Sequence, residues 1–264
     1  MNDNDLDPTF GARLDTDGWF IAPRAIGEPV LDAVCAQLEP ALALREAIRT
    51  RNHVEGANDG TLHHLLGDDD AFLALLEALR PFEPLLRWFF SGRCILNSYG
   101  GVINRKDGTA YVHNVHRDIR FASDTRRFML NLLVMLDEFT PENGATHVLT
   151  GSHREPEQPD AARFATEAQR ATGPRGSVLF FDSRLWHAAG SNVTGKPRRA
   201  LTLTFTSPFF KQQLDYPRLL GQESRAAADP FLRQLVGYNA RVPATLDDYY
   251  VPVAERFYQR GQDD

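Results

Sequence analysis

The sequence has few features of exported or membrane proteins. Only two of the 264 residues are cysteine, Cys35 and Cys94, and neither has metal or redox spacing, so we expect buried thiols in a cytoplasmic protein. The most apolar run, residues 128–136, is far too short to span a bilayer. The first ten residues carry acidic side chains and no basic side chain, the reverse of a secretory signal. We therefore expect neither export nor a membrane partner.

Basic charge is also scarce. Lys and Arg number 29 against 35 Asp and Glu, a net charge of −6, so we expect no nucleic-acid partner. The sequence lacks GxGxxG and GxxxxGK[ST], the glycine-rich motifs that bind nucleotide phosphates. It also lacks GxSxG, which holds the catalytic serine of many hydrolases, and HExxH, which binds zinc in many metalloproteases. The composition, with 42% hydrophobic residues, is that of a globular protein, and we expect one domain over residues 1–264.

Helical patterns are found mainly in residues 28–92. Apolar residues at steps of three and four predict a helix over residues 30–48. A second apolar stripe follows the acidic triplet 68–70, which we interpret as helix capping rather than as a metal-binding motif, because helix N-termini favour carboxylates. A third, short helix is expected to end near residue 92. We expect these helices to buttress a sheet.

Short β-rich runs separated by Gly, Pro and Asn occupy residues 93–210. The expected strands span residues 93–99, 128–136, 145–149, 177–182 and 200–206. In the last strand, apolar residues alternate with threonines, as in a strand with two unlike faces, and Arg198 shares the parity of the threonines. Residues 211–264 contain only short helical pieces. The expected fold class is mainly β with flanking helices.

One group of side chains points to metal chemistry. His116 and Asp118 lie two positions apart in a stretch that we expect to be extended, so both would project from one face. With His187 on an adjacent strand, they would occupy one face of an octahedral ferrous ion. Taken alone, an HxD triplet is more often a surface turn, and a histidine beside a tryptophan is more often a packed residue. Arg198 adds context, because a buried guanidinium there would clamp a dicarboxylate cosubstrate.

Six segments occur in an order that is itself informative. They are His116-Arg117-Asp118, residues 142–146, residues 151–154, residues 176–182, Leu185-Trp186-His187, and Asn192 with Arg198. In this combination the chain resembles the phytanoyl-CoA dioxygenase family over roughly residues 93–210. The resemblance implies a double-stranded β-helix, a cupin-like jelly roll whose mouth holds Fe(II) and 2-oxoglutarate. It implies that His116, Asp118 and His187 are the iron ligands. It also implies that Arg198, rather than Arg199, binds the far carboxylate of 2-oxoglutarate.

The resemblance further implies an Fe(II)- and 2-oxoglutarate-dependent dioxygenase. Such an enzyme uses O2 to hydroxylate or desaturate an unactivated C–H bond of a small molecule, with release of succinate and CO2. The carboxylate of Asp118 favours this over halogenation, because related halogenases have Gly or Ala at that position. Ala189 stands where family members often carry a small hydroxyl residue, which supports a second hypothesis of an inactive ligand-binding module. A zinc hydrolase with the same ligands is a third, which Arg198 disfavours.

Four further residues are candidates for the walls of the site. Asn131 is the one polar residue in residues 128–136 and needs a polar partner, either 2-oxoglutarate or the neighbouring backbone. Arg120 shares the parity of His116 and Asp118, and it either meets an anionic substrate or is a solvated or ion-paired arginine. The side chains of Phe121 and Trp186 either line an apolar substrate wall or belong to the core. The sequence chooses neither the substrate nor the oligomeric state.

Overall fold

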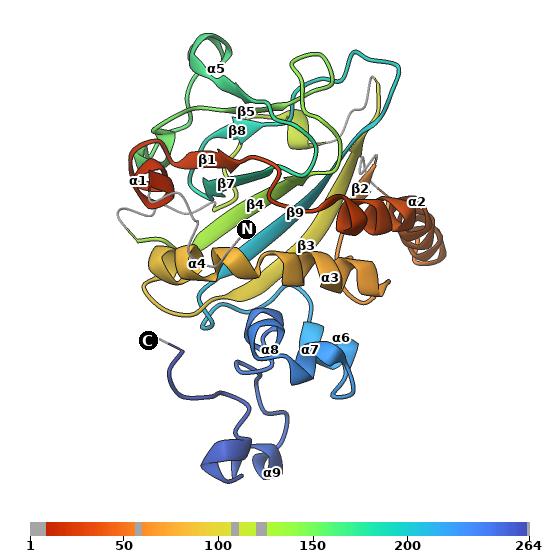
Figure 1. Cartoon of the computed structure of the whole chain (residues 1–264), viewed down its shortest axis with the longest axis vertical. Coiled ribbons are helices and arrows are strands. Elements are labelled where there is room, and N and C mark those ends of the chain that lie inside the picture. The colour runs from red at the N-terminus through yellow and green to blue at the C-terminus, as the bar shows by residue number, and fades with distance from the viewer. Residues whose placement is uncertain (1–8, 56–59, 107–110, 120–125, 263–264) are drawn as a thin grey trace.

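Two antiparallel sheets form the centre of the computed structural model, which describes residues 9–55, 60–106, 111–119 and 126–262 (Figure 1). The strands of the described residues are β1 (Trp19–Ala22), β2 (Thr61–Leu62), β3 (Ile95–Asn104), β4 (Met129–Met135), β5 (Thr146–Val148), β6 (Gln169–Ala171), β7 (Val178–Asp182), β8 (His187–Ala188) and β9 (Arg198–Thr206). The larger sheet has the order β1-β7-β4-β9-β3-β2, and the smaller has the order β6-β5-β8. Antiparallel sheets with flanking helices confirm the predicted fold class.

Helices flank the larger sheet and continue beyond it toward the C-terminus. In the described part of the chain they are α1 (Thr9–Thr16), α2 (Glu28–Arg51), α3 (Asp70–Ala78), α4 (Glu83–Phe90), α5 (Ala161–Glu167), α6 (Tyr216–Leu220), α7 (Arg225–Ala228), α8 (Pro230–Val236) and α9 (Leu246–Tyr249), with 3-10 turns at Arg80–Phe82, Tyr111–His113, Ser152–Arg154 and Val253–Glu255. The Asp69 side chain accepts a hydrogen bond from the Ala71 backbone N–H at 2.8 Å, which confirms the capping interpretation. None of the described helices is long and apolar enough to cross a bilayer.

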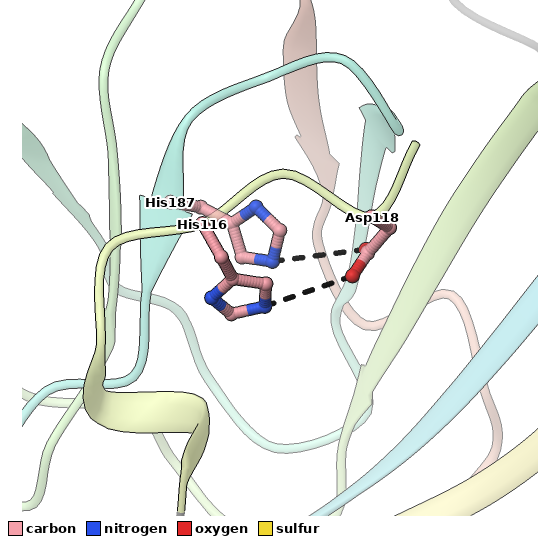
Figure 2. Close-up of side chains that lie close together, drawn as sticks. All are labelled: His116, Asp118 and His187. Atoms are coloured by element: carbon pink, nitrogen blue, oxygen red, sulfur yellow. Dashed lines mark ion pairs between the residues drawn. The ribbon is translucent and has the colours of Figure 1, made fainter. Parts of the chain in front are cut away.

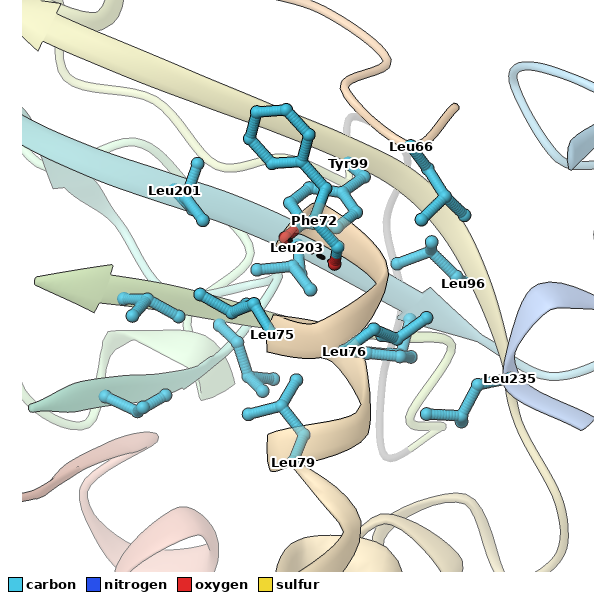
Figure 3. Close-up of a cluster of buried hydrophobic side chains, with 14 of the residues drawn as sticks. Leu66, Phe72, Leu75, Leu76, Leu79, Leu96, Tyr99, Leu201, Leu203 and Leu235 are labelled. Carbon is cyan, nitrogen blue, oxygen red and sulfur yellow. Dashed lines mark hydrogen bonds between the residues drawn. The ribbon is translucent and has the colours of Figure 1, made fainter. Parts of the chain in front are cut away.

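The two faces of the larger sheet have different surroundings. On β9, Leu201, Leu203 and Phe205 belong to the main hydrophobic core together with side chains of α3, such as Phe72 and Leu75 (Figure 3). The threonines between them, with Arg198 and Ala200, lie on the opposite face, and Thr202 and Thr204 line a cavity there. The alternation predicted for this strand is therefore confirmed, and it separates the helix-packed core from the cavity.

The expected strands are present, with shifted ends. The predicted strand 93–99 extends to Asn104 as β3, and the last predicted strand begins two residues earlier, at Arg198. The short strands β1, β2 and β6 were not predicted. Each is completed by pairing with a distant strand, β1 with β7, β2 with β3 and β6 with β5, which no local pattern reveals.

Candidate metal centre and cavity

Main-chain pairing brings the three candidate ligands together. His116 and His187 form an antiparallel bridge in which each backbone N–H donates to the other's carbonyl oxygen at 2.9 Å. Residues directly opposite each other in such a pair project from the same face. Asp118, two residues after His116 along the extended segment, projects from that face as well. The Asp118 backbone N–H donates to the Ser183 carbonyl oxygen at 3.0 Å, which ties this segment to the turn before His187. Figure 2 shows the three side chains pointing toward one another.

The geometry of these side chains suits a metal ion. Nε2 of His116 lies 3.6 Å from Oδ1 of Asp118, and Nε2 of His187 lies 3.8 Å from Oδ2 (Figure 2). Ligand atoms from all three residues lie within 4.8 Å of one another. Each Nδ1 faces a backbone carbonyl oxygen instead, that of Asn114 at 2.7 Å for His116 and that of Leu185 at 2.9 Å for His187. A carbonyl oxygen only accepts, so Nδ1 carries the proton and the Nε2 lone pair faces the shared centre.

Burial keeps His187 in the form that binds metals. Its pKa is lowered because burial disfavours the imidazolium, an effect that Asp118 opposes and His116 reinforces. A neutral imidazole is the ligand form of histidine. Two imidazoles and one carboxylate on one side of a common centre form the donor set expected for a ferrous ion with open positions. The residues present therefore fit the predicted metal.

A cavity of about 660 Å³ opens beside the triad, between the inner face of the larger sheet and the segment that carries His116. Its wall includes Arg198 and Asn131, both predicted as site residues, and Ala189. Ala189 brings no hydroxyl to this wall. Sequence reasoning missed the hydroxyl residues Thr61 and Ser98, which also line the cavity. They lie on β2 and β3, and neither strand contains a chemical motif that would single them out.

Arg198 is a buried cation on the cavity wall. The residue is 2% exposed, its Nη2 donates to the Gly144 carbonyl oxygen at 3.1 Å, and its guanidinium carbon lies 4.3 Å from the centre of the Phe139 ring. Among the described residues, its Nε has no hydrogen-bond partner. Burial lowers the pKa of Arg198 to about 10, so the side chain still carries its charge at neutral pH.

Arg199 faces the other way. Its side chain donates from Nη2 to Oδ1 of Asp137 at 2.6 Å and from Nε to Oδ2 at 3.0 Å, and this partner holds the pKa of Arg199 above its usual value. Of the two neighbouring arginines, Arg198 is thus the one on the cavity wall. This follows the strand parity noted in the sequence.

Asn131 has two side-chain partners. Its amide nitrogen donates to Oδ2 of Asp118 at 2.6 Å, and its amide oxygen accepts from the Thr204 hydroxyl at 2.9 Å. The alternative in which the neighbouring backbone satisfies this amide is therefore wrong. A role of Asn131 in binding 2-oxoglutarate stays a prediction, although the amide nitrogen already has the Asp118 carboxylate as its acceptor.

Trp186 lies away from the cavity. It packs with Leu149, Phe164 and Ala188 in a small hydrophobic cluster, and the Arg117 guanidinium carbon lies 5.0 Å from the centre of its ring. The prediction that Trp186 lines a substrate wall is corrected: the core alternative holds. Adjacent residues of an extended segment point to opposite faces. The position of Trp186 next to His187 therefore already indicated that the tryptophan side chain points away from the cavity. The predictions for Arg120 and Phe121 lie outside the described residues.

Comparison with known proteins agrees with this picture. The uncharacterized protein Rv1501 of Mycobacterium tuberculosis (strain ATCC 25618 / H37Rv) is 44% identical over 133 residues, 50% of this chain and 49% of that protein. The iron/alpha-ketoglutarate-dependent dioxygenase penM of Penicillium thymicola is 38% identical over 99 residues, 34% of this chain and 31% of that protein. The chain thus spans about half the length of the first of these relatives, and less of the second.

Solved structures share the fold. HygX from Streptomyces hygroscopicus, crystallised with nickel, 2-oxoglutarate and hygromycin B, has a TM-score of 0.61 at 18% identity, covering 82% of this chain and 95% of that one. EctD from S. alaskensis, crystallised with 2-oxoglutarate and 5-hydroxyectoine, has a TM-score of 0.62 at 21% identity, covering 78% of each chain. The double-stranded β-helix prediction is confirmed. The family model for phytanoyl-CoA dioxygenase (PhyH) matches residues 14–200, more than half of the sequence, and the chain therefore belongs to the phytanoyl-CoA dioxygenase family.

Proposed function

We propose that this protein is an Fe(II)- and 2-oxoglutarate-dependent dioxygenase that hydroxylates a small molecule. The observation that carries the proposal is the convergence of His116, Asp118 and His187 at a cavity whose wall also holds the buried cation Arg198. A mixed set of nitrogen and oxygen ligands on one side of a metal suits ferrous iron and leaves positions open. Family membership supports the same activity.

The chain's own residues hold and orient the reactants. His116, Asp118 and His187 would bind Fe(II), and the backbone carbonyl oxygens at each Nδ1 keep the imidazoles turned toward it. Bound iron, with 2-oxoglutarate and O2, would supply the oxidation of an unactivated C–H bond and the release of succinate and CO2. Desaturation, in which a second hydrogen atom is removed from the adjacent carbon, is the alternative outcome.

Arg198 would bind the far carboxylate of 2-oxoglutarate. A buried guanidinium whose Nε has no partner among the described residues is suited to a ligand that brings its own negative charge. Charge-assisted hydrogen bonds of this kind are among the strongest in proteins. Arg199 would play no part, because Asp137 already occupies its side chain.

The substrate would lie on the side of the cavity formed by β2, β3 and β9. Thr61, Ser98 and Thr202 line that side. The volume of about 660 Å³ is within the range of sites that take small-molecule ligands. An anionic substrate stays a prediction that depends on Arg120, which lies outside the described residues.

Sequential anaerobic additions test the proposal. Fe(II) and then 2-oxoglutarate should produce a weak visible charge-transfer band, and admission of air should then produce succinate, even without the substrate. The band should be lost in His187→Ala. A band with no succinate would favour the ligand-binding module, for which Ala189 on the cavity wall is the supporting observation. Zinc-dependent hydrolysis without a band would favour the hydrolase.

A further inference from the structure

We infer that Asn131 is a positioning residue for the metal-binding carboxylate of Asp118, and that Thr204 in turn holds Asn131. This inference rests on the proposed metal site. It concerns how the chain orients one ligand before any metal or cosubstrate arrives. The evidence is a chain of two hydrogen bonds, from the Thr204 hydroxyl to the Asn131 amide and from that amide to the Asp118 carboxylate.

The sheet places both positioning residues rigidly. Asn131 lies on β4 and Thr204 on β9, two paired strands inside the larger sheet, and the register sets these residues directly opposite each other. Opposed residues of an antiparallel pair have their side chains on one face at contact distance. Asn131 is only 4% exposed, so packing restricts its rotation.

Asp118 needs such support because its own segment provides little. It lies outside the named strands, and its side chain is 36% exposed. Among the described residues, the amide of Asn131 is the one hydrogen-bond donor to its carboxylate that lies at short distance, 2.6 Å. A carboxylate without that bond would be free to rotate away from the two imidazoles, at a cost in metal affinity.

The chemistry of the three groups fixes the direction of both bonds. An ionised carboxylate only accepts, so the nitrogen of the Asn131 amide must face it. The amide oxygen then faces Thr204, whose hydroxyl donates to it. A flipped amide would set its oxygen against the carboxylate and lose that bond. The bond occupies Oδ2 of Asp118 and leaves Oδ1, which lies 3.6 Å from Nε2 of His116, for a metal.

Metal binding in the absence of 2-oxoglutarate tests this role. The apoprotein is titrated anaerobically with Fe(II) alone, and 2-oxoglutarate affinity is then measured at saturating metal. Asn131→Leu keeps the branching and the number of side-chain heavy atoms and removes both hydrogen bonds, and we expect it to weaken Fe(II) binding by about 10- to 100-fold. Thr204→Val removes only the outer hydroxyl and should weaken Fe(II) binding less.

The double variant and a matched control sharpen the test. If Thr204 acts through Asn131, Asn131→Leu combined with Thr204→Val should bind Fe(II) no more weakly than Asn131→Leu alone. Thr206→Val is the control, because Thr206 lies on the same strand and the same face, and its buried hydroxyl has no hydrogen-bond partner among the described residues. It should bind Fe(II) as the wild type does. Circular dichroism establishes that each variant is folded, and Thr204→Val carries the test if Asn131→Leu does not fold.

The outcomes separate this inference from the proposed function. A wild-type protein that binds no Fe(II) would contradict the metal site itself. Wild-type Fe(II) affinity in both folded single variants would overturn the positioning role while leaving the metal site intact. Normal Fe(II) affinity in Asn131→Leu with weakened 2-oxoglutarate binding would overturn it in favour of the cosubstrate role predicted from the sequence.

Discussion

Replacing Arg198 by methionine should weaken cosubstrate binding and stabilise the apoprotein at the same time. The guanidinium is buried, and its Nε has no partner among the described residues, so its charge is poorly compensated until 2-oxoglutarate binds. Methionine has a similar length and no charge. The same change therefore removes an unfavourable burial in the apoprotein and a favourable ion pair in the complex.

The magnitudes follow from the burial of Arg198. Its pKa falls from the usual 12.5 to about 10, which corresponds to about 3 kcal/mol lost by the charged form on folding. We therefore expect the free energy of unfolding of the apoprotein to rise by up to about 3 kcal/mol, less whatever the contact with Phe139 contributes. Losing a buried ion pair with the cosubstrate should cost about 3 kcal/mol or more, which is at least about a 100-fold loss of 2-oxoglutarate affinity.

Two measurements check this prediction. Anaerobic titration of the Fe(II)-loaded protein with 2-oxoglutarate gives the affinity, and urea unfolding of the apoprotein gives the stability. Arg199→Met is the matched control: it removes the adjacent guanidinium, which is bound to Asp137, and should leave 2-oxoglutarate affinity unchanged. Normal affinity in Arg198→Met, or a loss of several kcal/mol in apoprotein stability, would refute the reasoning.

The pH dependence has a definite sign. Because the pKa of Arg198 is lower in the folded state than in the unfolded chain, the unfolded chain binds more protons above about pH 10. Below about pH 10, the buried charge of Arg198 destabilises the folded state by its full amount. Above that pH the buried side chain loses its proton, so this destabilisation decreases and the free energy of unfolding rises. The stability difference between Arg198→Met and the wild type should be constant near neutral pH and should shrink above about pH 10, as followed by urea unfolding.

Three further changes test the metal site and the packing around it. Asp118→Gly should weaken Fe(II) binding and abolish succinate formation, so wild-type rates of succinate release would count against a ligand role. Gly100→Ala places a Cβ 2.7 Å from a backbone carbonyl oxygen and should cost about 1–3 kcal/mol by thermal unfolding, whereas Gly195→Ala, with nothing within 4 Å, should not; equal melting temperatures would contradict this. Arg184→Met leaves the buried carboxylate of Asp182 without its charged partner and should cost about 3–5 kcal/mol in urea unfolding; an unchanged midpoint would show that the ion pair is dispensable.

Local patterns predicted the parts of the site that depend on strand alternation. The two-residue period predicted that His116 and Asp118 share a face and that Arg198 lies with the threonines of β9. Both arrangements are present in the structure. The same rule, applied to Trp186 beside His187, would have placed the tryptophan in the core.

Long-range pairing accounts for what the sequence could not reveal. The bridge between His116 and His187 and the register that sets Asn131 opposite Thr204 join segments far apart in the chain. Register depends on the packing of the whole sheet, which no short window of sequence contains. The expected burial of Asn131 predicted that its amide has polar partners. The sequence could not identify these partners as Asp118 and Thr204.

The most direct measurement is the anomalous diffraction of crystals soaked anaerobically with Fe(II). One strong iron peak should lie between Nε2 of His116, Nε2 of His187 and the carboxylate of Asp118, with 2-oxoglutarate reaching from it to Arg198 after a second soak. An iron peak elsewhere, or none between these three side chains at saturating Fe(II), would contradict the account.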